Sequence, residues 1–144
     1  MRLYRTALRV WKDMKAPKKE INLAISLLLD ESGSMSGAKA EITRLTAILF
    51  AEACEKLGIP YIYGAIHGWV AQVAVDMPGQ RLIEKMYPEG ATFKDKSSLS
   101  FTPGLCASMQ TALCVKLLVG RPVQTGTIFY FDMLEQEFET IPMA

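Results

Sequence analysis

Apolar and polar positions divide the chain into segments of two kinds. Residues 21–29 are almost continuously apolar, which is typical of a strand covered on both faces of a sheet. Residues 38–57 repeat apolar side chains every three or four positions, which predicts a helix, and Gly58 is its natural end. The side chains of this helix that we expect to face inward are Ile42, Leu45, Ile48, Leu49, Ala53 and Leu57.

Further along the chain, the pattern predicts a second strand, an edge strand hairpinned onto it, a short helical segment, a second long helix and a last strand. Their expected ranges are, in this order, residues 59–66, 69–75, 82–86, 103–119 and 127–131. The helix at 38–57 would link two parallel strands as a β-α-β crossover. We therefore expect a three-layer, Rossmann-like α/β fold, whose mostly parallel sheet has the strand order 3-2-1-4 and an antiparallel edge strand.

Residues 2–14 form a separate amphipathic segment. Its apolar stripe consists of Leu3, Tyr4, Ala7, Leu8, Trp11 and Met14. Residues 1–20 carry seven Lys or Arg and two acids, a net +5, while the remainder carries nine basic and thirteen acidic residues, a net −4. Such a helix can bind membrane surfaces or acidic partners, or resemble a transit peptide, but docking on its own domain is the favoured alternative. We divide the chain into this lead-in helix and linker, residues 1–19, and one domain, residues 20–144.

The composition excludes several classes of function. With 144 residues, 50% of them hydrophobic, and a net charge of +1, the chain is one globular domain with no bulk attraction for nucleic acid. It has no apolar run of the roughly 20 residues that a membrane helix needs, and no secretory signal. Its three cysteines lack metal-site spacing and suit a reducing compartment. We expect a cytoplasmic protein.

Oxygen-bearing side chains follow the first strand directly. Asp30, Ser32 and Ser34 lie in a loop at the carboxyl end of that strand, which is where open α/β sheets bind their ligands. Three hard oxygen groups at this spacing suit a Mg²⁺-like cation that keeps several of its waters. The sequence therefore predicts a cation site at this loop.

Residues 30–35, D-E-S-G-S-M, resemble the D-x-S-x-S motif of the von Willebrand factor A domain. The resemblance covers roughly residues 20–133 and is closest to the domains of intracellular cobalt-chelatase subunits. It implies a metal-ion-dependent adhesion site for Mg²⁺ (or Mn²⁺), with Ser32 and Ser34 as direct ligands and Thr102 bound directly or through water. Asp30 and Asp132 would act mainly through waters. Family members have two further strands, so the domain would be truncated after its fourth strand.

The resemblance further implies a metal-dependent protein–protein interaction module and not an enzyme. A partner's Asp or Glu would complete the metal shell, and the partner class would be an AAA+ ATPase or its substrate in a chelatase-like or remodelling assembly. The expected rim of the partner site is Glu31, Met35 and His67. Taken singly, Thr102 also fits a helix N-cap, Asp132 a strand-end turn residue and His67 a structural residue near Trp69.

Two other functions stay open, namely a Mg²⁺-dependent phosphate-ester hydrolase that uses Asp30, and a degenerate copy with only a structural role. The chain lacks a G-x-x-x-x-G-K-[ST] phosphate loop, and Ser32 stands where a dehalogenase-like phosphatase needs a second aspartate. In the order 3-2-1-4 the strand at 127–131 has an unpaired apolar edge, so we also expect self-association through it.

Overall fold

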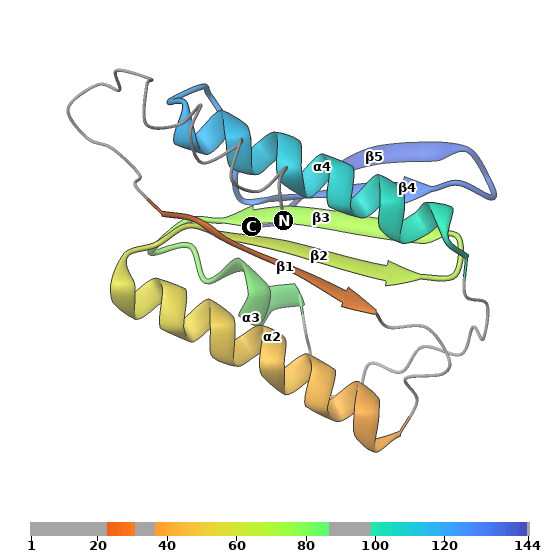
Figure 1. The fold of residues 1–144 in the computed structure, drawn as a ribbon, viewed down its shortest axis with the longest axis horizontal. Coiled ribbons are helices and arrows are strands. Elements are labelled where there is room, and N and C mark those ends of the chain that lie inside the picture. Colours follow the sequence, from red (N-terminus) through yellow and green to blue (C-terminus); the bar gives the residue numbers. More distant parts are fainter. Residues whose placement is uncertain (1–22, 31–36, 87–98, 144) are drawn as a thin grey trace, which may run out of the picture.

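The computed structural model describes residues 23–30, 37–86 and 99–143 (Figure 1). The predicted helix at 2–14 lies outside these residues. The described elements are β1 (Ile25–Asp30), α2 (Ala38–Leu57), β2 (Tyr61–His67), β3 (Val70–Asp76), α3 (Leu82–Met86), α4 (Phe101–Leu118), β4 (Thr127–Asp132) and β5 (Glu137–Pro142).

The elements form three layers, with one sheet between two helical layers. Helix α4 covers one face of the sheet, and α2 and α3 cover the other (Figure 1). This confirms the α/β class. None of the described helices is both long enough and apolar enough to cross a membrane.

The strand order is β1-β2-β3-β4-β5, and only the β1–β2 pair is parallel. The predicted mostly parallel sheet with the order 3-2-1-4 is therefore wrong. The physical reason lies in β3, which forms the expected hairpin with β2 but is buried along nearly its whole length. A strand covered on both faces is typical of a sheet interior, and β4 pairs along the outer side of β3, with Asp132 opposite Val70.

Two hydrophobic cores fill the spaces between the layers. The core on the α2 side includes Tyr61 and Tyr63 from β2 and Leu82 and Ile83 from α3. The core under α4 takes the alternate positions of the same sheet, including Ile62, Val73 and Val75, and the helix itself adds Cys106, Leu113 and Leu117. Because successive strand residues point to opposite faces, β2 and β3 supply both cores at once.

Helix α2 has the predicted bounds but not the predicted orientation. Its buried positions are Ala47 and Cys54, with Ala51 partly buried, whereas Ile42, Leu45, Leu49 and Leu57 are exposed. The predicted inward stripe is therefore wrong for these four residues and for Ala53, which is also exposed. Small side chains lie where the helix contacts the sheet, which lets the helix approach closely, and the large apolar side chains lie elsewhere on the helix.

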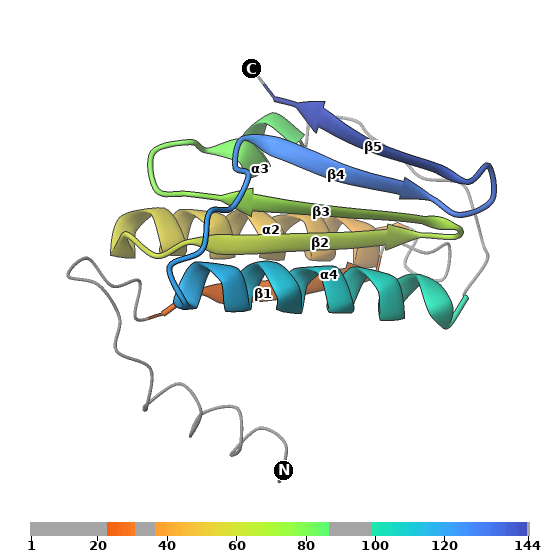
Figure 2. The ribbon, with the colours of Figure 1, turned by 90° about the horizontal axis from the view of Figure 1, so that it is seen from above.

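Residues 137–142 form a strand, β5, that sequence reasoning did not predict. β5 pairs antiparallel with β4 along its whole length, from Thr127 opposite Pro142 to Asp132 opposite Glu137. β4 is thus paired on both sides, and self-association through its edge loses its basis. Figure 2 shows β4 and β5 extending beyond α4 at one side of the sheet, and β1 at the opposite side beneath α4.

Candidate functional site

The predicted metal site begins at the end of β1. Asp30 is the last residue of that strand, is exposed and stands opposite Ile66 of β2. The predicted residues that lie outside the described part of the chain are Glu31, Ser32, Ser34 and Met35. Among the residues that the structure describes, no three His, Cys, Asp or Glu side chains come together in a set that could hold a metal ion.

Asp132 does not lie beside Asp30. The predicted order made their strands neighbours, but β2 and β3 lie between them. Three strand spacings of about 4.8 Å place the two residues roughly 14 Å apart. Asp132 Oδ1 instead accepts hydrogen bonds from the backbone N–H groups of Leu134 (3.0 Å) and Glu135 (3.1 Å). Its carboxylate therefore stabilises the turn between β4 and β5.

Thr102 is fully buried in the first turn of α4. Its hydroxyl donates to the carbonyl oxygen of Gly68 at 2.7 Å, which attaches the start of α4 to the β2–β3 turn. The N-cap position belongs to Ser100, not to Thr102. This contact shows a structural use of the Thr102 hydroxyl.

His67 ends β2 and is partly buried, opposite Val70 in the hairpin. The neighbouring Trp69 stacks on Phe101, with ring centroids 4.9 Å apart. His67 and Thr102 are thus grouped at the β2–β3 turn. The pairing of the strands places Asp30, His67 and Asp132 in a row along one end of the sheet. The three residues lie on three different strands and do not surround one point.

A buried amide that sequence reasoning missed joins α4 to the two parallel strands. Gln110 is 3% exposed, and its Nε2 donates to the carbonyl oxygens of Leu27 (2.9 Å) and Ile62 (3.2 Å). Gly64 makes room for it, since a Cβ there would lie 2.5 Å from Gln110 Cδ. The signal in the sequence was a polar position eight residues after Thr102 on the same helix face. This contact holds β1 in place.

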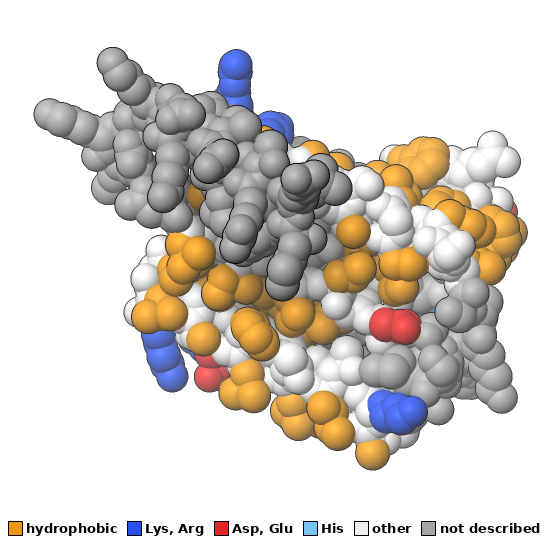
Figure 3. All heavy atoms as spheres, in the orientation of Figure 1, with side chains coloured by type: hydrophobic (Ala, Val, Ile, Leu, Met, Phe, Trp, Pro, Cys, Tyr) orange, Lys and Arg blue, Asp and Glu red, His pale blue; other side chains and the backbone are white. Residues whose placement is uncertain are grey.

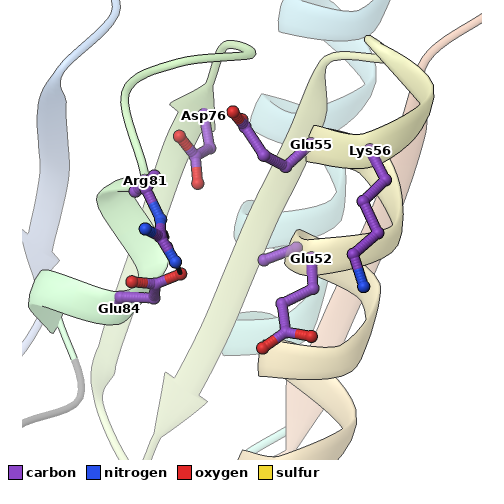
Figure 4. A pocket seen from close by; sticks show the side chains of 7 residues that line it. Glu52, Glu55, Lys56, Asp76, Arg81 and Glu84 are labelled. Atoms are coloured by element: carbon purple, nitrogen blue, oxygen red, sulfur yellow. Dashed lines mark hydrogen bonds and ion pairs between the residues drawn. The ribbon is translucent and has the colours of Figure 1, made fainter.

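A hollow between α2 and α3 has an acidic lining and a volume of about 270 Å³ (Figure 4). Its lining residues are Ala51, Glu52, Glu55, Lys56, Asp76, Arg81 and Glu84. Asp76 accepts hydrogen bonds from the backbone N–H groups of Leu82 (3.0 Å) and Ile83 (3.3 Å), and burial raises the pKa of its carboxyl. Arg81 pairs with Glu84 at 2.7 Å. Several of these groups thus already serve the local structure.

The two outer strands of the sheet differ in how their edges are protected. β5 carries Glu137, Glu139 and Pro142, which are the residue types that discourage pairing with another chain. β1 reads I-S-L-L-L-D and has no charged residue before Asp30. No described strand pairs with the side of β1 that faces away from β2. We call this side the β1 edge.

Apolar side chains continue from the β1 edge onto α2. Figure 3, in the view of Figure 1, shows hydrophobic side chains gathered along α2 and around β1. Four large ones on α2 are 45–68% exposed and recur every three to eight positions. We call this set the α2 stripe, and it consists of Ile42, Leu45, Leu49 and Leu57. Isolated apolar residues are ordinary on a surface, but a continuous patch is typical of a docking site.

Comparisons with known proteins give a likeness in fold only. No protein-family model matches the chain, and no curated protein matches it. The similar solved structures include MccB of E. coli with MccA-N7isoASN, at 12% identity and a TM-score of 0.57, covering 83% of this chain and 37% of MccB. They also include PaaA, at 12% identity and a TM-score of 0.50, covering 83% of this chain and 42% of PaaA. A third is a heterocyclase with substrate and cofactor, at 10% identity and a TM-score of 0.52, covering 85% of this chain and 24% of the heterocyclase. The chain thus spans less than half the length of each.

These findings correct the family that the sequence suggested. The fold is similar to those of MccB, PaaA and a heterocyclase, and not to a von Willebrand factor A domain of the cobalt-chelatase type. The loop sequence at 30–35 resembles that family's motif, but the strand order does not place Asp132 where an adhesion site requires it. The motif alone did not determine the fold.

Proposed function

We propose that the chain is a non-catalytic protein-binding module whose partner adds a strand to the β1 edge. The observation that supports this proposal is the contrast between the outer strands, since β5 carries acidic residues and proline and β1 is apolar. Addition of an extended segment to an exposed strand is a common mode of peptide recognition. Protein binding was also expected from the sequence, but the proposed site is a sheet edge and not a metal ion.

The layers around β1 define what kind of strand fits. Leu27 and Leu29 face the core beneath α2, while Ser26 and Leu28 face the α4 side. A strand that pairs with β1 would lie at the border of both helical layers and meet apolar side chains on each face. The expected partner segment is therefore apolar on both faces, as β1 itself is.

The backbone of β1 shows which groups a partner would use. The N–H of Ile25 donates to the carbonyl oxygen of Pro60 at 3.1 Å, so odd-numbered residues of β1 bond toward β2. Backbone groups alternate along a strand, and those of Ser26 and Leu28 therefore point to the β1 edge. Proline at position 26 would remove the backbone N–H that points to the β1 edge, and it would leave the hydrogen bonds between β1 and β2 in place.

This alternation gives a matched pair of variants. We expect Ser26→Pro to fold and to lose strand addition, and Ser26→Thr, which keeps the donor, to retain it. The probe is a labelled peptide with the sequence of residues 23–30 and a lysine tag for solubility, and its binding is followed by fluorescence anisotropy. Sedimentation equilibrium of the chain alone tests pairing between two copies. Equal binding by both variants, or no binding by the wild type in either assay, would overturn the proposal.

ATP use is not part of this proposal. MccB of E. coli has been solved with ATP, but at 14% identity that likeness concerns the fold. The hollow between α2 and α3 is lined by four carboxylates and two cationic side chains, and this lining would repel a triphosphate. The expected AAA+ ATPase partner rested on the corrected resemblance and is likewise not carried forward.

Binding of Mg²⁺ at Asp30 is a separate prediction that the β1 edge does not require. Its support is the hard oxygen set of Asp30, Ser32 and Ser34 in the sequence. Calorimetric titration of wild type and Asp30→Ala with Mg²⁺ tests it. Equal heats for the two chains would remove the cation site.

A further inference from the structure

The α2 stripe is a large apolar surface on a helix whose other side already packs on the sheet. Leu49 and Leu57 are 65% and 68% exposed, whereas Ala47 and Cys54 on the same helix are buried. We propose that residues 2–14 of this chain form an amphipathic helix that docks on the α2 stripe. This inference concerns a different surface from the β1 edge and does not rest on the proposed function.

The position of β1 puts the α2 stripe within reach of this segment. β1 begins beside the turn that follows α2, because the N–H of Ile25 donates to Pro60 and α2 ends at Leu57. Residues 15–22, which connect the segment to the described chain, span up to about 26 Å when extended. The segment can therefore reach the C-terminal end of α2 and lie along it.

The two apolar surfaces match in length. A helix over residues 2–14 is about 20 Å long, and the stripe from Ile42 to Leu57 extends about 22 Å along α2. With helical periodicity, the sequence of this segment would place Leu3, Leu8 and Trp11 on one face and its arginines and lysines mostly off that face. Those charges would stay in water when the apolar faces meet.

A tether favours this occupant over a second copy of the chain. A short linker gives an effective local concentration in the millimolar range, so even a weak contact within one chain exceeds association between chains at micromolar concentration. The stripe itself consists of uncharged aliphatic side chains, which suit the apolar face of a helix. The docked segment would also shield α2 from unrelated proteins.

Trp11 provides the test, because the chain has only one other tryptophan, Trp69. Trp69→Phe keeps an aromatic ring against Phe101 and leaves Trp11 as the sole reporter. In this chain we expect Trp11 emission at short wavelength and weak quenching by acrylamide. Adding Leu45→Lys and Leu49→Lys should shift the emission to longer wavelength and raise the quenching.

The matched control is Val115→Lys, because Val115 is 40% exposed but lies on α4, on the opposite face of the sheet. It should leave Trp11 fluorescence unchanged, and circular dichroism should show that all variants are folded. The proposal would be overturned if acrylamide quenched Trp11 as strongly in the Trp69→Phe chain as in a free peptide of residues 1–22. It would also be overturned if Trp11 were protected from acrylamide only when the chain self-associates, or only when anionic lipid vesicles are present.

Discussion

Exchange of Gly64 for alanine tests the buried contact that holds β1 in the sheet. A Cβ at position 64 would lie 2.5–2.7 Å from three side-chain atoms of Gln110. Overpacking of this kind costs about 1–3 kcal/mol. We therefore expect Gly64→Ala to lower the free energy of unfolding by that amount, although alanine in a strand is otherwise better than glycine.

Removal of Gln110 should abolish or reverse the destabilising effect of Gly64→Ala. Gln110→Ala deletes hydrogen bonds to Leu27 and Ile62, each worth about 1 kcal/mol, and leaves a cavity, for a total of about 2–4 kcal/mol. In that background the added methyl at position 64 enters space that the amide occupied. Gly64→Ala should then be neutral or stabilising, with a coupling energy of about 1–3 kcal/mol.

Urea unfolding of the four chains followed by circular dichroism measures this cycle. Gly104→Ala is the matched control, because a Cβ at Gly104 in α4 meets no atom within 4 Å. It should stabilise the chain by up to about 1 kcal/mol in both backgrounds. Additive effects of Gly64→Ala and Gln110→Ala would refute the contact between them.

Three further predictions follow from other parts of the fold. Asp132→Ala should lower the free energy of unfolding by about 1 kcal/mol, measured by urea unfolding, because it removes the turn hydrogen bonds to Leu134 and Glu135. It should leave the heat of any Mg²⁺ binding unchanged, and loss of that heat would show that Asp132 does belong to the metal site. Burial raises the pKa of the Asp76 carboxyl above its usual 3.8, so the free energy of unfolding should fall as pH rises from 3.8 through the raised pKa. Asp76→Asn should reduce this pH dependence in a series of unfolding curves, and an unchanged dependence of the free energy of unfolding on pH would contradict the prediction. Burial raises the pKa of the Cys106 thiol to about 12, so Cys106 should resist thiol labelling in the native chain, and mass spectrometry showing rapid labelling would contradict its burial.

Local elements could be predicted from the sequence because local patterns define them. Gly58 adopts the left-handed conformation that ends α2, and α2 and the short helix α3 have the predicted bounds. The hairpin between β2 and β3 follows from the turn at Gly68. All of these features depend on residues close together in the chain.

The strand order could not be predicted because it depends on contacts between distant residues. The apolar pattern of β1 indicated an interior strand, yet β1 is an outer strand of the described sheet. The strand at 127–131 was expected to have an unpaired edge, but residues 137–142 pair with it as β5. Gln110 was missed because one amide in an apolar helix gives no sign of its partners, Leu27 and Ile62, which lie far away in sequence.

Hydrogen exchange at single amides of β1 shows whether the outer side of this strand is open to another strand. In the free chain, we expect fast exchange at Ser26 and Leu28, whose N–H groups point to the β1 edge, and slow exchange at Leu27 and Leu29, which bond toward β2. Addition of the residue 23–30 peptide should slow exchange at Ser26 and Leu28 and leave Leu27 and Leu29 unchanged. Slow exchange at all four amides in the free monomer would show that the edge is already covered, and strand addition at the β1 edge would then be wrong.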